Sequence, residues 1–227
     1  MAKQIYLVGG SKGGVGKSMV TTALIDYLRE QGENVLLVES DTSNPDCWKA
    51  HKDTTTCALI DLDRADGWIE LVNTCEGKAD HVVVINTAAR NNVAVTRYGE
   101  TLQSTLGELK RELITLWVIN RQRDSLELLK VYTDAITTGS VHVIRNSFFG
   151  AEDKFALYNA SKTRKMIEDR GSLSLTFPEL ADRVSDDLYS RRMSIAVALK
   201  ELQIGNRAEL ARWRGQVRTV LAQATGA

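Results

Sequence analysis

The sequence predicts an α/β fold in which a doubly wound, mostly parallel sheet is flanked by helices. Short runs rich in valine, isoleucine and leucine alternate with longer segments of helical periodicity, as in βαβ units. A glycine-rich turn separates the first such run from the first helical segment. No repeat and no linker rich in proline, glycine or serine interrupts the 227 residues, so we expect a single domain over residues 1–227.

The predicted strands are short and apolar enough to be buried on both faces of a parallel sheet. They lie at residues 4–8, 34–39, 81–85, 114–119, 141–144 and 173–176. Helical periodicity, in which apolar residues recur every three or four positions, fills most of the intervals. The predicted helices lie at residues 17–30, 65–75, 100–110, 124–136, 154–169, 188–202 and 207–223.

The overall composition argues against several partners and compartments. Lys plus Arg and Asp plus Glu each total 29, so no net charge favours a polyanion or an anionic membrane. No apolar run approaches the roughly 18 residues of a membrane-spanning helix, and the first residues lack the features of a signal peptide. Cys47, Cys57 and Cys75 fit neither a disulfide framework nor a metal-ligand spacing. We therefore expect a cytoplasmic protein.

The segment VGGSKGGVGKSMV, residues 8–20, predicts a phosphate-binding loop. It follows a strand and opens a helix, which is the context that supports a P-loop motif. The glycines let the backbone curl so that successive N–H groups point at phosphate oxygens, and the helix dipole adds positive potential. Lys17 is expected to reach the β and γ phosphates, and the Ser18 hydroxyl to ligate Mg²⁺. The predicted nucleotide-binding residues of this loop are Gly13, Gly14, Val15, Gly16, Lys17, Ser18 and Met19.

The loop departs from the strict P-loop pattern, which has glycine at the position of Ser11. The stretch KGGVGKS, residues 12–18, resembles the deviant Walker A loop of the ParA/MinD family of P-loop ATPases. The resemblance implies ATP and Mg²⁺ as cofactors and a homodimer that sandwiches the nucleotides on ATP binding. It also implies a catalytic role for Lys12, which would reach the nucleotide of the partner subunit. The alternative is that Lys12 is a solvated loop lysine.

The resemblance continues at the ends of the second and third predicted strands. Glu39 and Asp41 fall where the family carries D-x-D, which implies that Asp41 is catalytic and helps to hold Mg²⁺. The alternative is an aspartate that shapes the following turn. Asn86 falls where the family carries the Walker B aspartate, and an amide has no charge to offset the metal. We therefore expect nucleotide binding with slowed hydrolysis, switch II at residues 87–92, and Arg90 near the γ-phosphate.

Two later stretches resemble the parts of the family that contact adenine. Asn146 matches the asparagine whose amide pairs with the adenine edge, and the alternative is a turn-forming role. Pro178 and Glu179, followed by Leu180, match the loop that closes over the base. Asn120, after the fourth predicted strand, is less informative because asparagine commonly ends strands.

The last predicted helix is amphipathic and basic. Its apolar stripe favours docking on the protein's own sheet; the stripe comprises Leu210, Trp213, Val217, Val220 and Leu221. The alternative is non-specific contact with DNA through its arginines, which are Arg207, Arg212, Arg214 and Arg218. Membrane binding is disfavoured because Glu209 and a polar tail interrupt the basic, apolar character that a membrane-surface helix requires.

Taken as a whole, the resemblance implies an ATPase of weak activity that acts with a protein adaptor or cargo in plasmid or DNA partitioning, positioning or conjugation. Within the family, the chain resembles the small plasmid-borne members linked to plasmid stability and conjugation, represented by TraL and StbB. The alternative that Asn86 supports is a nucleotide-gated binding switch with little or no hydrolysis. A metabolic ATP-dependent ligase is disfavoured because Lys12 has no evident role there.

Overall fold

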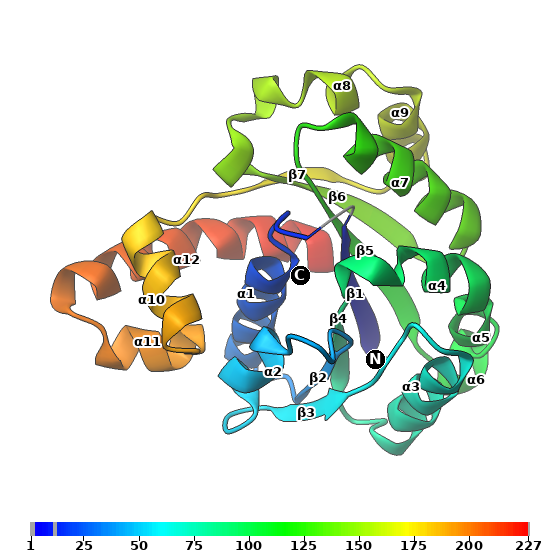
Figure 1. The fold of residues 1–227 in the computed structure, drawn as a ribbon, viewed down its shortest axis with the longest axis horizontal. Coiled ribbons are helices and arrows are strands. Elements are labelled where there is room, and N and C mark those ends of the chain that lie inside the picture. Colours follow the sequence, from blue (N-terminus) through cyan, green and yellow to red (C-terminus); the bar gives the residue numbers. More distant parts are fainter. Residues whose placement is uncertain (1–2, 11–12, 227) are drawn as a thin grey trace.

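The computed structural model describes residues 3–10 and 13–226, apart from the side chains of Arg90 and Asn92. Its strands form one parallel sheet in the order β3-β2-β4-β1-β5-β6-β7, which confirms the predicted fold class (Figure 1). The strands are β1 (Gln4–Gly10), β2 (Val35–Glu39), β3 (Thr56–Leu59), β4 (Val82–Asn86), β5 (Glu112–Ile119), β6 (Ser140–Asn146) and β7 (Ser174–Phe177).

Helices cover both faces of the sheet. One face carries α1 (Lys17–Glu30), α2 (Asp46–His51), α10 (Asp182–Ser190), α11 (Ile195–Glu201) and α12 (Ile204–Thr225). The other carries α3 (Ala65–Gly77), α4 (Asn92–Tyr98), α5 (Glu100–Gln103), α6 (Leu106–Leu109), α7 (Arg123–Ala135), α8 (Ala156–Asn159) and α9 (Lys162–Asp169). Short 3-10 turns lie at Ala89–Asn91, Ser147–Phe149 and Glu152–Lys154.

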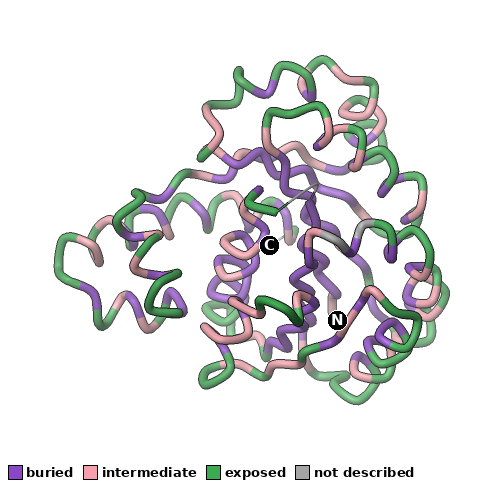
Figure 2. The backbone as a smooth tube through the Cα atoms, viewed as in Figure 1, coloured by how far each residue is buried: buried purple, intermediate pink, exposed green. Residues whose placement is uncertain are grey.

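Two hydrophobic cores follow from this double covering. Along β1, Tyr6 and Val8 pack under α1 and α12, whereas Ile5 and Leu7 pack on the opposite face. Successive side chains of a strand point to opposite faces, so a strand buried on both faces must be apolar throughout. Figure 2 shows the buried strands at the centre, with exposed residues at the outer surfaces of the helices.

Two of the predicted long helices are interrupted by serine caps. The segment predicted at residues 154–169 divides into α8 and α9. That predicted at 188–202 spans the end of α10, which begins earlier, at Asp182, and the whole of α11. The Ser161 hydroxyl accepts a hydrogen bond from the Arg164 backbone N–H, and Ser194 does the same for a residue at the start of α11. These serines satisfy the free N–H groups at a helix start, so they favour a new helix over the continuation of the old one. Periodicity alone did not separate these helices.

Other differences concern short elements. The predicted helix at residues 100–110 divides into α5 and α6, and β3, α2 and α4 were not predicted. β3 has four residues and pairs only with β2 in the described sheet, where it forms an edge. So short a segment has too few residues for a periodic signal, and its pairing with β2 stabilises it instead.

Helix α12 docks as the apolar stripe predicted. Its residues Leu210, Trp213, Val217 and Leu221 are buried in the core beside α1, and Val220 is partly buried there. Over residues 3–10 and 13–226, no helix is both long and apolar enough to cross a membrane.

Candidate functional site

The predicted phosphate-binding loop joins β1 to α1 at the carboxyl end of the sheet. Gly14 (φ 77°) and Gly16 (φ 102°) adopt left-handed backbone conformations that favour glycine. A Cβ atom on Gly16 would lie 2.3 Å from Nδ2 of Asn146, so this position also needs glycine for space. The first turn of α1 begins at Lys17 and directs its free N–H groups at the loop. Lys12 lies outside the described residues, and its role in a partner's site stays a prediction.

A cavity of about 470 Å³ opens beside this loop, within the size range of small-molecule sites. The predicted site residues that line it are Gly13, Gly14, Gly16, Lys17, Ser18, Met19, Asp41, Asn86, Asn146, Pro178 and Glu179. Val15 is buried beneath the loop instead, where its side chain joins the core. The structure therefore brings together segments that are more than 100 residues apart in the sequence.

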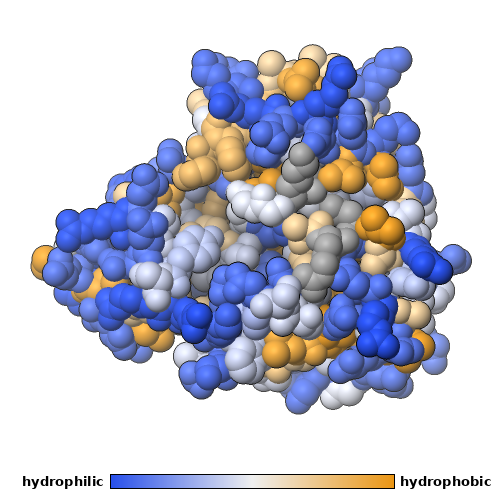
Figure 3. Space-filling model, in the orientation of Figure 1, coloured by the Kyte–Doolittle hydropathy of each residue, from blue (hydrophilic) through white to orange (hydrophobic). Residues whose placement is uncertain are grey.

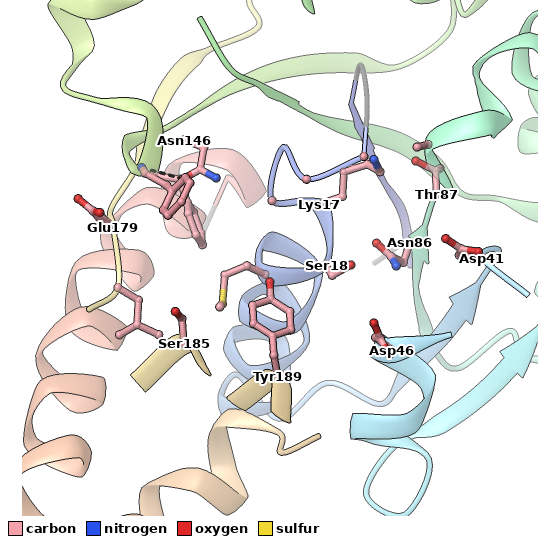
Figure 4. A pocket seen from close by; sticks show the side chains of 18 of the residues that line it. Lys17, Ser18, Asp41, Asp46, Asn86, Thr87, Asn146, Glu179, Ser185 and Tyr189 are labelled. Carbon is pink, nitrogen blue, oxygen red and sulfur yellow. Dashed lines mark hydrogen bonds between the residues drawn. The ribbon is translucent and has the colours of Figure 1, made fainter. Parts of the chain in front are cut away.

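Lys17 supplies a buried positive charge to the cavity, beside the predicted phosphate-binding loop. Burial lowers the pKa of Lys17 to about 8, while the carboxylates of Asp41 and Glu39 act in the opposite direction. The ammonium group therefore stays charged at neutral pH. Figure 4 shows Lys17 between the Asn146 side and the Asn86 side of the cavity, with the Ser18 hydroxyl directed toward the same region as Asn86.

Asn86 is paired with a buried carboxylate on the neighbouring strand. Asn86 and Glu39 are register partners at the ends of β4 and β2. The Asn86 amide Nδ2 lies 3.1 Å from both carboxylate oxygens of Glu39, and its Oδ1 accepts a hydrogen bond of 3.0 Å from the Thr21 hydroxyl. Burial raises the pKa of Glu39 to about 7, against hydrogen bonds from the Asp41 backbone and Asn86 that favour the ionised form. A carboxylate is therefore present on the strand next to Asn86, the residue predicted to stand at the Walker B position.

Asp41 shapes the turn after β2, which is one of the two roles that the sequence left open, and it also lies at the cavity. Its Oδ1 accepts hydrogen bonds from the Ser43 hydroxyl at 2.8 Å and from the Asn44 backbone N–H at 3.2 Å, which shapes the turn after β2. It also lines the cavity opposite the base side (Figure 4). The turn holds the carboxylate near the phosphate end, and a catalytic role for Asp41 stays a prediction.

The donor set at this end of the cavity fits Mg²⁺. Ser18 and Asp41 provide hard oxygen atoms, as that ion prefers. Within the part of the chain that the structure describes, no group of three or more His, Cys, Asp or Glu side chains could hold a metal ion. Because Mg²⁺ usually keeps water and phosphate ligands and takes few from the protein, this sparse set suits Mg²⁺ bound with a nucleotide.

Asn146 braces the phosphate-binding loop from the other side. Its Nδ2 donates a 2.9 Å hydrogen bond to the carbonyl of Val15, and its Oδ1 accepts one of 3.1 Å from the Phe148 backbone N–H. The turn-forming role is thus present, together with a contact to the loop that sequence reasoning missed. The contact of Asn146 with adenine stays a prediction. Asn120, in contrast, lies outside the cavity lining and accepts hydrogen bonds from Ser125 and Gln122 in its own turn.

The cavity is also lined by residues that no sequence motif marked. They are Phe148, Phe177, Ser185, Tyr189 and Trp213. Ser185 and Tyr189 come from α10, and the exposed Glu179 directs its carboxylate away from Lys17 (Figure 4). Trp213 was assigned only to the docking stripe of α12, since a helical apolar pattern does not tell which stripe residue reaches a cavity.

The arginines of α12 take part in contacts within the chain. Arg214 pairs with Asp26 at 2.6 Å and with Glu30 at 2.8 Å, and Arg218 also reaches Glu30. Arg212 pairs with a neighbouring glutamate on the same helix. Figure 3 shows a mixed distribution of hydrophilic and hydrophobic side chains over the lobe that contains α10 and α11. These ion pairs offset the positive charges of the α12 arginines. Contact with DNA through the same arginines stays a prediction.

Comparison with known proteins places this geometry among nucleotide-binding domains. A model of the "CobQ/CobB/MinD/ParA nucleotide binding domain" family matches residues 6–150. Protein MobD of Acidithiobacillus ferrooxidans is 70% identical over 221 residues, covering 97% of each chain.

Solved structures agree in fold. The MinD cell division protein of Aquifex aeolicus is 16% identical with a TM-score of 0.56, and the match covers 92% of this chain and 95% of that one. A chain of the MinC:MinD cell division protein complex from the same organism is 15% identical with a TM-score of 0.56, covering 92% and 94%. At such identities the likeness shows the P-loop α/β fold alone.

Proposed function

Because the chain belongs to the CobQ/CobB/MinD/ParA nucleotide-binding domain family, we propose that it binds ATP with Mg²⁺ in the cavity beside α1. The observation that carries this proposal is the convergence of the glycine loop, the buried Lys17 ammonium and the Ser18 hydroxyl at the start of a helix. Backbone N–H groups and a helix dipole favour phosphate oxygens at this place. Asn146 and the loop at residues 178–180 border the space left for the base.

Ser18 and Asp41 are the residues that would hold Mg²⁺. When bound, the ion offsets phosphate charge and orients water for phosphoryl transfer. Glu39 lies behind Asn86, and its carboxylate accepts the hydrogen bonds of the Asn86 amide. The protein's own contribution is then positioning and charge neutralisation.

We further propose that ATP binding favours a homodimer in which Lys12 of each subunit reaches the partner's nucleotide. The dimer would recruit a protein adaptor or cargo in plasmid or DNA partitioning, positioning or conjugation. The sequence of residues 12–18 supports the dimer. The MinC:MinD complex, in which a chain of similar fold occurs with a protein partner, supports an adaptor.

Calorimetric titration with ATP and Mg²⁺, combined with light scattering, tests both proposals. The wild type is expected to bind ATP and to double in mass, whereas Lys12→Ala is expected to bind ATP and remain monomeric. Lys130→Ala, on the exposed side of α7 and ion-paired with Asp134, serves as the charge-matched control. Failure of the wild type to bind ATP would refute the function, and a dimer of Lys12→Ala would refute only the role of Lys12.

A second candidate function is a nucleotide-gated binding switch that hardly hydrolyses ATP. The observation that favours it is the neutral Asn86 at the Walker B position, with its amide engaged by Glu39. Bound ATP would then act by favouring one of two conformations or assembly states.

Single-turnover phosphate release separates the two candidates. Asn86→Asp alone would put two carboxylates in contact, and such a pair shares a proton. A better test is therefore the double variant Glu39→Gln with Asn86→Asp. In it the carboxylate and the amide change places, so the pair still has one of each. The switch predicts negligible release by the wild type and an increase of about tenfold or more in the exchanged variant. Clear wild-type release that Lys17→Ala abolishes would refute the switch.

A further inference from the structure

Trp213 connects the C-terminal helix to the wall of the cavity opposite the phosphate-binding loop. Its indole Nε1 donates a 2.9 Å hydrogen bond to the carbonyl of Pro178. Its ring meets Phe177 edge to face, with ring centroids 5.7 Å apart and an interplanar angle of 84°. The side chain is 0% exposed and still contributes to the cavity lining. It therefore supports the loop at residues 178–180 from behind.

The next residue, Arg214, connects the same helix to α1, whose first turn lies beside the predicted phosphate-binding loop. Its Nε and Nη2 donate to the two carboxylate oxygens of Asp26, at 2.6 and 3.1 Å. Asp26 belongs to α1, whose first residue is Lys17. A two-point guanidinium–carboxylate contact fixes orientation as well as distance. Two consecutive residues of α12 thus fix this helix to the loop at residues 178–180 and to α1.

We propose that Trp213 is a positioning residue for the base of the bound nucleotide. Its indole N–H donates to the Pro178 carbonyl, and Arg214 fixes the same helix to α1. Helix α12 thereby sets the distance between the loop at residues 178–180 and the phosphate-binding loop. The inference rests on the proposed binding of ATP. Removing the N–H leaves the phosphate loop braced by Asn146 but frees the wall to shift. Loss of the Trp213 N–H should therefore weaken the binding of the base and leave the binding of the phosphates nearly unchanged.

The test compares two tryptophan-to-phenylalanine variants that lose the same kind of hydrogen bond. Trp213→Phe loses the bond to Pro178. Trp68→Phe loses a 2.9 Å bond from Nε1 to the carbonyl of Leu62, and Trp68 is equally buried but in the core of the opposite face. Each variant and the wild type are titrated with Mg-ATP and with Mg-tripolyphosphate, which carries the phosphates without a base. Thermal unfolding gives the stability of each variant.

The expected result is a change of ligand preference. Trp213→Phe should weaken ATP binding about fivefold or more, because one hydrogen bond is lost, and change tripolyphosphate binding less than about twofold. Trp68→Phe should leave both affinities unchanged. If Trp213→Phe does not fold, Arg214→Lys keeps the charge, loses the two-point contact and should lower the ATP affinity more than the tripolyphosphate affinity.

Three results would overturn the inference. One is equal ATP affinity of Trp213→Phe and Trp68→Phe, and another is equal weakening of both ligands by Trp213→Phe. The third is a wild type that binds ATP no better than tripolyphosphate, because the base would then contribute nothing. In each of these cases the wild type still binds tripolyphosphate, so the proposed function stands. A wild type that binds neither ligand would instead overturn the proposed function, and this inference with it.

Discussion

The proposed phosphate side and the proposed base side of the cavity are built in different ways. The main part of the proposed phosphate side is one continuous segment, residues 13–19, whose shape depends on glycine conformations and on the start of α1, and Asp41 joins it from the turn after β2. The base side is assembled from β6, β7, α10 and α12. The shape of the glycine-rich loop depends on its own residues, whereas the base side depends on how elements distant in the sequence pack together. A change on the phosphate side should therefore affect binding directly, whereas the base side should respond to changes in the helices that support it.

The largest expected effect is on the phosphate side, in Lys17→Ala. Removing a buried ammonium from a triphosphate site should weaken ATP binding by about 100-fold or more, because hydrogen bonds to charged groups contribute most. Calorimetry measures the affinity, and circular dichroism shows whether the variant is folded. Retention of wild-type affinity by a folded Lys17→Ala would mean that ATP does not bind at this loop.

The second test concerns the support of the base side. Arg214→Gln should lower the free energy of unfolding by about 2 to 3 kcal/mol, because the buried Asp26 loses its partner. Arg212→Gln is the matched control on the same helix, where the exposed ion pair with Glu209 should contribute nothing measurable. Urea unfolding measures both variants. Equal stability of the two would show that α12 is not fixed to α1 through Arg214.

The third test uses pH to probe the packing of α2 against α1 beside the phosphate side. Burial lowers the pKa of His51 to about 4, and the nearby Arg29 charge acts in the same direction. An unfolded histidine titrates near pH 6.5. The unfolded chain therefore takes up this proton first, so stability is fully present above about pH 6.5 and falls as the pH decreases toward 4.

The expected loss from His51 between pH 7 and pH 5 is about 2 kcal/mol. Urea unfolding at the two pH values measures it, and His51→Gln should be less sensitive to pH by that amount. A variant as sensitive as the wild type would mean that His51 is protonated in the folded state at these pH values.

The smallest effect is expected at Glu179, on the base side. Its exposed carboxylate points away from Lys17 (Figure 4), so Glu179→Gln should change the ATP affinity less than about twofold. The same titration measures it. A larger loss would show that the side chain turns into the cavity when ATP binds, and that base recognition involves more than the position of the loop.

Sequence reasoning predicted the residues whose function follows from local chemistry. Gly16 and Lys17 belong to one motif, and the cavity forms where that motif predicted it. The pairing of Glu39 with Asn86 could not be predicted, because it depends on β2 and β4 being neighbours in the sheet. Trp213 was predicted to be buried, but its contact with Pro178 joins residues 35 positions apart.

The sequence by itself determined the fold class, the family and the place of the glycine-rich turn between β1 and α1, because strand periodicity and glycine conformations act over a few residues. The tertiary structure decided which groups meet across the sheet and at the cavity. It placed a buried carboxylate beside the uncharged Walker B position, and it set α12 against both α1 and the loop at residues 178–180. These contacts depend on strand order and helix packing, so their physical basis is burial and hydrogen-bond geometry between distant segments rather than any local pattern.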